Sequence, residues 1–385
     1  MRLYDLNDFL RLSATLNYQL SAAPVSTDAL LYTITGDRPL SEDHRRVLLD
    51  VLTYLDQAYG QKRRRLGPMA VLHPLRATAL LAAAADKLHL LDLLSILLHD
   101  KFEDVGPEDQ SPEEWQVLEE RFHALLKRID PTDEWYLMER LELLTRRGDH
   151  ESYYAYIGRL VDRAASTPEL VRVKLVDRLD NTLDMRIDFQ DPLDEADFFA
   201  HLFRVLFVPG YAGYQPERSH PPAAPLNGAR RLYELFKTVV TLSLVRQMRS
   251  IAPTDVVGLR LFEALCIASM NEAQRIVMHI SGYHLRDTVK QRALLLETMD
   301  YCQRGGVRSI TAPGAPHRLD GLFLAQFDHR DRKSLHAKLD ALYQDKELMI
   351  EAALAFIVIF TSFLSDPAFY LRGVTAEGIH VEAAA

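Results

Sequence analysis

Two histidines and a group of carboxylates are the residues of this chain best suited to chemistry. Five of these residues stand close together in the sequence: His73, His99-Asp100 and Glu103-Asp104. A further carboxylate, Asp177, follows later, with the amide Asn181 four positions after it. Imidazole nitrogens and carboxylate oxygens together form a mixed donor set that suits a first-row divalent ion. Such an ion can keep one position open for water. The donor set therefore predicts a metal site.

The first of these residues lie in a stretch, Val71–Val105, that predicts a helical hairpin. The part from Leu90 to Asp104 has a strong apolar pattern and no helix breaker, so we expect a single helix there. At 100° per residue, the His-Asp pair and the Glu-Asp pair then share one face of that helix. Burying a helix that ends in several carboxylates is costly unless a cation neutralises them, which again favours a metal.

Asp177 and Asn181 belong to a second predicted helix, at about Glu169–Met185, which begins after the N-terminal pattern Thr-Pro-Glu. The two residues are four positions apart and therefore share one face of it, so both can point at one site. This helix is the expected source of the missing ligand.

These motifs have a family resemblance. The chain has "HP" at His73-Pro74, "LLHDxxED" at Leu97–Asp104 and "KLxDRLxN" at Lys174–Asn181. In this order they resemble the HD-domain metal-dependent phosphohydrolases, and more narrowly the (p)ppGpp hydrolase domain of the RelA/SpoT family. The resemblance covers roughly residues 40–207 and does not extend to the synthetase or regulatory regions of the long family members. It implies a hydrolase-only protein.

The resemblance also implies roles for single residues. The metal, most often manganese, would be held by His73, His99, Asp100 and Asp177. Glu103 and Asp104 would orient or activate the attacking water. The residues that match Arg64 and Asn181 would contact the nucleotide. Because Arg64 belongs to a basic turn, Lys62 or Arg63 could take its place. The implied reaction removes the 3′-pyrophosphate of (p)ppGpp or a related alarmone.

The chain departs from the family pattern at several positions beside the ligands. Asp180 stands where the family usually has histidine, and Asp184 where it often has a small polar residue. Arg63–Leu66 and Met69-Ala70 also differ from the usual sequence before the HP pair. We expect these changes to lie in the wall that contacts the base, with a solvated helix face as the other interpretation of Asp180 and Asp184. Guanine selectivity is therefore left open.

Other interpretations stay open at this stage. The chain could be an HD phosphatase for another nucleotide, such as a deoxynucleoside monophosphate or a nicotinamide dinucleotide phosphate. It could also be a binding module that senses a nucleotide without turnover, although the Glu-Asp pair argues against this. A second group, His279, His284 and Asp287, lacks a second carboxylate at ligand spacing, so we expect structural histidines there.

Composition limits the partners and the compartment. The chain has 385 residues, 48% hydrophobic and 26% charged, as in ordinary globular proteins. A net charge of −9 argues against a general nucleic-acid binder but not against a small nucleotide substrate. The two cysteines, Cys266 and Cys302, have no CxxC spacing, and the first residues do not form a secretory signal, so we expect a cytoplasmic protein. The apolar run Ala352–Leu364 is shorter than the roughly twenty residues that span a bilayer, so we expect a core helix and no membrane partner.

The predicted fold class is all-α. We expect an HD-type helical bundle in residues 1–207, a linker rich in proline and glycine in 208–228, and a further helical domain of unknown role in 229–385. No segment shows convincing strand alternation, and residues 1–40 are left unassigned. The long apolar helices after the linker are expected to form a core or a homo-oligomer interface.

Overall fold

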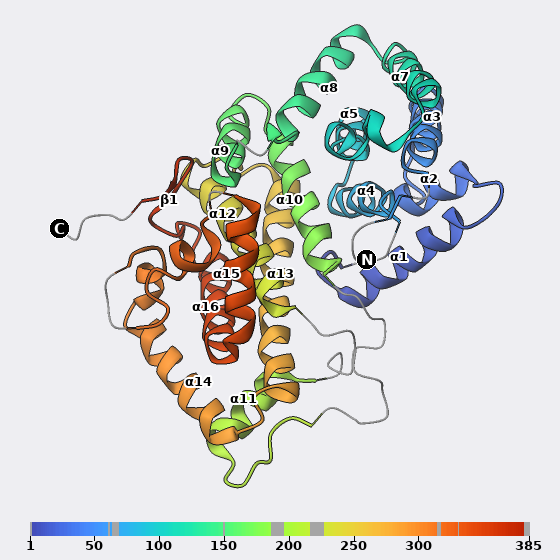
Figure 1. Cartoon of the computed structure of the whole chain (residues 1–385). Coiled ribbons are helices and arrows are strands. Elements are labelled where there is room, and N and C mark those ends of the chain that lie inside the picture. Colours follow the sequence, from blue (N-terminus) through green and yellow to red (C-terminus); the bar gives the residue numbers. More distant parts are fainter. Residues whose placement is uncertain are drawn as a thin grey trace. The chain divides into compact units, whose positions relative to one another are not determined.

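The computed structural model describes residues 2–60, 62–63, 69–148, 151–185, 196–215, 227–313, 317–329 and 331–380. Their regular secondary structure is almost wholly helical (Figure 1), which confirms the all-α fold class. Within them, the strands are limited to the antiparallel pair β1 (Val374–Thr375) and β2 (Gly378–Ile379). The sequence analysis missed this pair because two residues are too few to show an alternating pattern.

The chain forms two compact units that do not follow sequence order. Unit 1 consists of Met1–Glu151, Arg159–Leu183 and Ser250–Leu265, and unit 2 of Ser152–Gly158, Asp184–Arg249 and Cys266–Ala385. The predicted linker, 208–228, falls in unit 2, and its residues 216–226 lie outside the described part of the chain.

Unit 1 contains every residue of the predicted metal site and of the basic turn, whereas Asp184 belongs to unit 2. Its helices are α1 (Leu6–Leu20), α2 (Thr27–Thr35), α3 (Glu42–Tyr59), α4 (Leu72–Ala84), α5 (Leu90–Leu97), α6 (Lys101–Asp104), η1 (Pro107–Asp109), α7 (Pro112–Leu126), α8 (Pro131–Leu144) and α10 (Glu169–Leu183). Helix α9 (Tyr153–Arg163) contributes residues to both units.

Capping explains where several of these helices begin and end. The Ser41 side chain accepts a hydrogen bond from the His44 amide at the start of α3, and Gly60 ends this helix with a φ of 46°. Helices α1 and α2 occupy the segment that the sequence left unassigned. Each begins at a capping side chain, Asp5 and Ser26 respectively, which is the signal that the mixed composition obscured.

Helix α4 is the centre of unit 1. Nearly every residue of it is buried, and it packs against α1, α2, α5 and α10. Arg76 is its one charged side chain apart from the ionisable His73, and only 1% of Arg76 is exposed. A buried guanidinium requires an anionic partner, so α4 both fills the core and positions a charge within it.

The single helix predicted from Leu90 to Asp104 is wrong. Helix α5 ends at Leu97, α6 begins at Lys101, and His99 and Asp100 occupy the break between them. The imidazole Nδ1 of His99 lies 2.6 Å from the Ile96 carbonyl oxygen, the acceptor that a continuing helix would pair with the amide of Asp100. The His99 ring therefore bonds to the Ile96 carbonyl in place of that amide. The break moves the side chains of His99 and Asp100 out of helical register.

Unit 2 contains α11 (Phe198–Phe207), α12 (Gly228–Gln247), most of α13 (Val256–Tyr283), α14 (Thr288–Gln303), η3 (Gly306–Thr311), the π-helical turn η4 (Phe323–Phe327), α15 (Arg332–Gln344) and α16 (Lys346–Ser365). Among the described residues, α16 is the one helix long and apolar enough to cross a membrane, but 67% of its most apolar stretch is buried inside the structure. It is the core helix that the sequence predicted, although the localisation stays a prediction.

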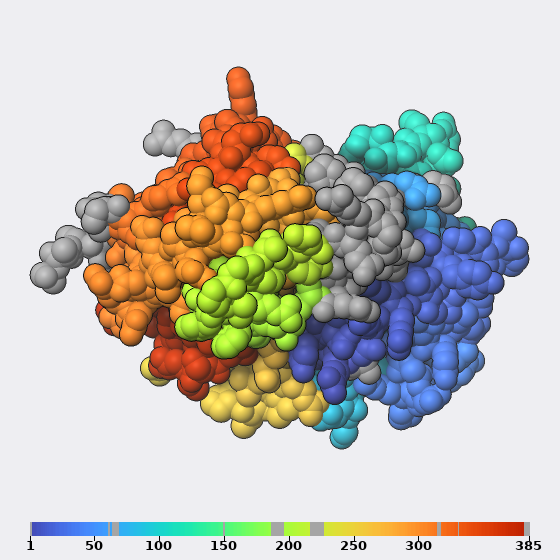
Figure 2. All heavy atoms as spheres, turned by 90° about the horizontal axis from the view of Figure 1, so that it is seen from below, coloured from blue at the N-terminus to red at the C-terminus, as the bar shows by residue number. Residues whose placement is uncertain are grey.

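Helix α11 carries an apolar face that the rest of the described chain leaves uncovered. It lies at the surface of unit 2 against α14 (Figure 2). Phe199, Phe203 and Phe207 recur every four residues and are 59 to 66% exposed. The predicted homo-oligomer through C-terminal helices stays a prediction, because this exposure does not identify what would cover the face.

A buried charge network joins three elements of unit 1 around the metal-site helices. Arg140 on α8 donates to Asp92 on α5 at 3.1 Å, and Arg172 on α10 lies 3.7 Å from the other oxygen of that carboxylate. Arg172 also pairs with Asp255, which caps α13 through the Gly258 amide. Removing Asp92 takes from Arg140 its nearest carboxylate inside the unit and leaves it with Glu169, at 3.5 Å.

We therefore expect Asp92→Ala to lower the free energy of unfolding of unit 1 by about 3 kcal/mol. Both tryptophans, Trp115 and Trp135, belong to unit 1, so their fluorescence during urea unfolding reports on this unit selectively. The control is Asp86→Ala, which breaks an exposed ion pair with Arg260 and should cost less than about 1 kcal/mol. Equal effects of the two variants would contradict the role of the buried network.

Candidate metal centre

His73, His99 and Asp177 meet inside unit 1. One donor atom of each lies within 4.8 Å of the others, all three residues are buried, and the group could hold a metal ion. His73 comes from the first turn of α4, His99 from the break between α5 and α6, and Asp177 from the middle of α10. The packing of α4 against α5 and α10 brings these separate elements together.

The distances between donor atoms match those around a small cation. The His73 Nε2 atom lies 3.1 Å from His99 Nε2 and 3.2 Å from Asp177 Oδ1, and His99 Nε2 lies 3.8 Å from the same oxygen. Asp100 approaches both rings, with its oxygens 3.3 Å from His73 Nε2 and 3.1 Å from His99 Nε2. Two donors bound at about 2.1 Å and at 90° to 109° from each other would lie roughly 3.0 to 3.4 Å apart.

Hydrogen bonds on the far side of each ring determine which nitrogen faces the cluster. The Nδ1 atom of His73 lies 2.6 Å from Asp180 Oδ2, and that of His99 lies 2.6 Å from the Ile96 carbonyl oxygen. Both partners can only accept, so both Nδ1 atoms carry the proton. In the neutral rings, the two Nε2 lone pairs then face each other and the carboxylate oxygens, an arrangement that requires positive charge at its centre.

The pKa shifts express the same requirement. Burial opposes the charged form of His99, but the attraction of Asp100 and Asp177 outweighs it and raises the pKa of His99 well above its usual 6.5. Burial also opposes the charged carboxylates, yet the neighbouring imidazoles, and Lys174 beside Asp177, hold the pKa values of Asp100 and Asp177 far below 3.8. Protons or a metal ion can supply the positive charge, and the two compete for the same atoms.

Asp177 is held in place by two neighbours on its own helix. Lys174 donates to Oδ2 and Asn181 donates to Oδ1, each at 2.6 Å. Asp177 and Asn181 share one face of α10, as their spacing predicts, and their side chains contact each other. Asn181 was expected to bind the nucleotide; in the structure its amide orients the ligand carboxylate.

The expectation for Asp180 is wrong. Its side chain is fully buried and contacts His73 and Arg76, so it lies neither in a wall facing the nucleotide base nor on a solvated helix face. Burial opposes its charge, but Arg76 and His73 lower its pKa to about 2. Met69 and Ala70 are likewise buried in the hydrophobic core of unit 1, which removes them from the expected wall.

Glu103 stands at the rim of the cluster. Its Oε1 accepts a hydrogen bond from the Arg146 amide at 2.7 Å, and its side chain remains exposed. The pKa of Glu103 is raised, first by partial loss of water around it and then by repulsion from Asp100 and Asp177, which places it near the ligands. Its exposure limits that shift. Asp104 is half-buried one residue further on, at the end of α6.

The predicted phosphate-binding cations are only partly described. Lys62 forms an ion pair with Asp109 at 2.8 Å and donates to the backbone carbonyl of Asp104, so its amine lies beside the end of α6. Arg63 pairs with Met69 through a short backbone bridge. Arg64 lies outside the described residues.

Arg76 and Lys174 are site residues that the sequence analysis did not assign to the site. A signal for Arg76 exists, because it is a lone basic residue in the otherwise apolar segment LHPLRATALLAAA, three positions after His73. Asp180 follows Asp177 by the same three positions on α10. Two such pairs on packed helices can face each other, since residues three apart share a helix face.

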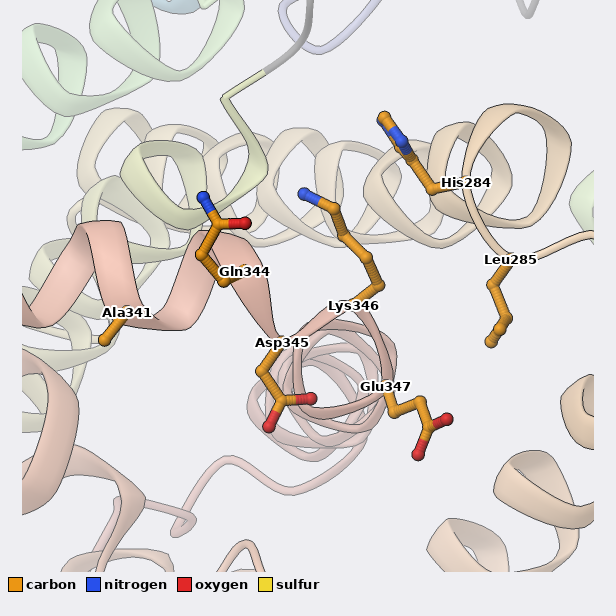
Figure 3. Close-up of a pocket in the computed structure, with 7 residues that line it drawn as sticks. All are labelled: His284, Leu285, Ala341, Gln344, Asp345, Lys346 and Glu347. Carbon is orange, nitrogen blue, oxygen red and sulfur yellow. The ribbon is translucent and has the colours of Figure 1, made fainter.

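Among the described residues, the second histidine group of the sequence does not form a cluster of converging metal donors. Asp287 accepts hydrogen bonds from the amides of Val289 and Lys290 and so caps α14. The His279 and His284 rings lie 5.6 Å apart, and burial followed by repulsion from His284 lowers the pKa of His279 to about 4. A surface hollow of about 470 Å³ adjoins them (Figure 3); its side chains include His284, Lys346, Asp345 and Glu347. The two carboxylates pair with Arg318 rather than with the histidine.

Comparison of the chain with models of protein families, with curated proteins and with solved structures finds no match. A function can therefore be proposed only from the geometry of the cluster and from the motifs of the sequence.

Divalent metal binding is the first consequence of this geometry. We expect one Mn²⁺ ion per chain in isothermal titration calorimetry of chelator-treated protein. Asp100→Ala should weaken binding by more than about 100-fold, because a ligand contributes more than its supporting residues do. Asp43→Ala removes a carboxylate that is 93% exposed and should leave the affinity unchanged. Binding that is insensitive to Asp100 would contradict this site.

Metal binding should also depend on pH. Because the pKa of His99 is raised above 6.5 in the protein without metal, the ring holds a proton near neutral pH and must release it to bind an ion. The affinity for Mn²⁺ should therefore rise between pH 6 and pH 8, by about tenfold per pH unit for each proton released. Titrations in buffers of different ionisation enthalpy count those protons, and an affinity independent of pH would contradict the assignment.

Proposed function

We propose that the protein is a metal-dependent phosphohydrolase that acts on a phosphorylated nucleotide, with the 3′-pyrophosphate of (p)ppGpp or a related alarmone as the favoured target. The observation that carries the proposal is the convergence of two imidazole Nε2 atoms and two carboxylates on one buried point, with both Nδ1 atoms already used. A divalent ion fits this donor set, and Mn²⁺ is the ion that the family resemblance favours.

A bound divalent ion supplies a lowered pKa for water and compensation of negative charge on phosphoryl oxygens. The residues around it then have separate tasks. His73, His99, Asp100 and Asp177 bind, and Lys174 and Asn181 keep Asp177 from turning away. The open side of the cluster is the side of α6, where Glu103 is exposed and Asp104 is half-buried.

Glu103 is the side chain best suited to take a proton from the attacking water. It lies near Asp100 and Asp177 without belonging to the tight donor group, and the Arg146 amide fixes one of its oxygens. A raised pKa brings a carboxylate nearer to the operating pH, which makes it a better general base. Asp104, one residue on, would assist in orienting the water.

The choice of an alarmone is supported by the three motifs and by one correction from the structure. Asp180 differs from the family pattern, but it faces His73 and Arg76 rather than a substrate. This difference therefore no longer counts against guanine. Lys62 is the cation of the basic turn whose amine contacts the end of α6, which supports a role in binding a phosphate. Other nucleotides, including a deoxynucleoside monophosphate or a nicotinamide dinucleotide phosphate, remain the competing substrates.

A binding module without turnover is the competing function from another class. Glu103 distinguishes the two, because a sensor of nucleotides has no use for a proton acceptor beside the metal ligands. The test is a turnover screen with Mn²⁺ in which the protein meets ppGpp and the competing nucleotides and the released product is identified. We expect pyrophosphate from ppGpp. Tight nucleotide binding without any product in saturating Mn²⁺ would contradict the enzyme.

Glu103→Gln separates catalysis from binding. We expect turnover of the best substrate to fall by about 10²- to 10⁴-fold, the usual contribution of a general base. The Mn²⁺ affinity should change by less than a few-fold, because Glu103 is not among the converging donors. Glu108→Gln, in the nearby turn η1, serves as the matched control. Turnover equal to that of the unaltered protein would remove Glu103 from the mechanism.

A further inference from the structure

Beneath the metal centre lies a buried ion pair that the hydrolysis itself does not use. Arg76 on α4 binds Asp180 on α10 through two contacts, Nε to Oδ1 at 2.9 Å and a terminal nitrogen to Oδ2 at 3.0 Å. Both side chains are at most 1% exposed. A two-point arginine–carboxylate contact fixes the carboxylate in position as well as in charge.

Asp180 connects this pair to a metal ligand. Its Oδ2 atom, already bonded to Arg76, also accepts the Nδ1 proton of His73 at 2.6 Å. The hydrogen bond sets the tautomer of His73 and the rotation of its ring, so that Nε2 faces His99 and Asp177.

Arg76 is in turn held by the N-terminal helix. Its guanidinium lies over the Phe9 ring, 5.0 Å from the centroid, and donates to the Ser13 hydroxyl at 3.2 Å. Both residues belong to α1. A chain of contacts thus runs from α1 through Arg76 and Asp180 to His73.

The charges explain why an arginine accompanies this aspartate. A buried carboxylate without a counter-ion is costly, and Arg76 supplies the counter-ion for Asp180, as Lys174 does for Asp177. The pair can therefore orient His73 without altering the net charge that the metal meets.

We propose that Arg76 and Asp180 are positioning residues for the metal centre: Asp180 holds His73 as a ligand, and Arg76 keeps Asp180 oriented and neutralised. This inference rests on the metal centre of the proposed function but not on any particular substrate. The inference also gives α1 an indirect part in metal affinity, because α1 acts on the ligands through Arg76.

Mn²⁺ affinity and protein stability, measured on the same variants, distinguish positioning from a merely structural role. Asp180→Asn keeps the shape but removes the charge, and the amide can turn its donor toward Nδ1 and reverse the tautomer. We expect a 10- to 100-fold loss of Mn²⁺ affinity, the usual effect of altering a residue that supports a ligand. The variant should also unfold more easily, because Arg76 is left buried without its partner.

The double variant Arg76→Met/Asp180→Asn removes both charges and should recover most of the lost stability. Its Mn²⁺ affinity should stay low, because His73 still lacks a carboxylate partner. Asp92→Asn is the matched control: it disturbs another buried arginine–carboxylate pair of unit 1 and should lower stability while leaving Mn²⁺ affinity unchanged. Affinity that recovers together with stability in the double variant would overturn the positioning role.

A spectroscopic measurement tests the same contact without metal. In protein labelled with ¹⁵N-histidine and treated with chelator, we expect an exchange-protected, downfield Nδ1 proton from His73, assigned by its absence in His73→Gln. The signal should be lost in Asp180→Asn and kept in Asp92→Asn. Its absence from the unaltered protein would overturn the proposal even if the protein binds Mn²⁺ and hydrolyses nucleotides. Conversely, failure to hydrolyse any nucleotide, with Asp180-dependent Mn²⁺ binding intact, would overturn the proposed function alone. Unaltered protein that binds no Mn²⁺ would overturn both.

Discussion

Several electron-rich atoms lie close together in the core of unit 1, and their mutual repulsion is the constraint on which the structure of the site depends. Two imidazole nitrogens and the oxygens of two carboxylates lie within hydrogen-bonding range of one another, in a place where water is largely excluded. Such a cluster is stable only with compensating positive charge, and each feature around it supplies or directs some. Lys174 stands beside Asp177, Arg76 stands beside Asp180, and the remaining demand at the centre is what a divalent ion satisfies.

The fold meets this constraint by devoting its most buried helix to it. Helix α4 is largely apolar and packs on four neighbours, so its two ionisable side chains, His73 and Arg76, cannot reach solvent. Residues three apart share a helix face, and α10 presents Asp177 and Asp180 with the same spacing. The packing of α4 against α10 thus creates two layers. The inner layer, His73 and Asp177, offers donor atoms to a metal ion, and the outer layer, Arg76 and Asp180, orients His73. The break after α5 completes the inner layer, because a continuous helix would place His99 and Asp100 in a different register.

Much of this arrangement was predictable from the residues. Helical periodicity and the N-terminal pattern Thr-Pro-Glu located α10, and the spacing of histidines and carboxylates selected the residues that meet at the cluster. The break at His99 was not predictable. The His99 side chain bonds to the Ile96 carbonyl oxygen in place of the Asp100 amide, and an apolar pattern does not record such a contact. The position of Asp180 was missed for a related reason. It was compared with a family pattern on one helix, whereas its partner Arg76 lies on another, and only packing reveals the pair.

The distinction between the two layers affects how the chemistry should be attributed. Asn181 and Asp180 follow the ligand Asp177 by four and three residues, and both would be assigned to the substrate by motif position alone. The contacts point inward instead: Asn181 bonds to Asp177, and Asp180 bonds to His73. In the proposed function, substrate contacts would come mainly from the side of α6, where Glu103 is exposed and Lys62 lies beside the end of that helix. Selectivity for a nucleotide would then be a property of this rim, while metal affinity would be a property of the buried helices. The two can vary independently, because a change at the rim need not disturb the charge balance inside.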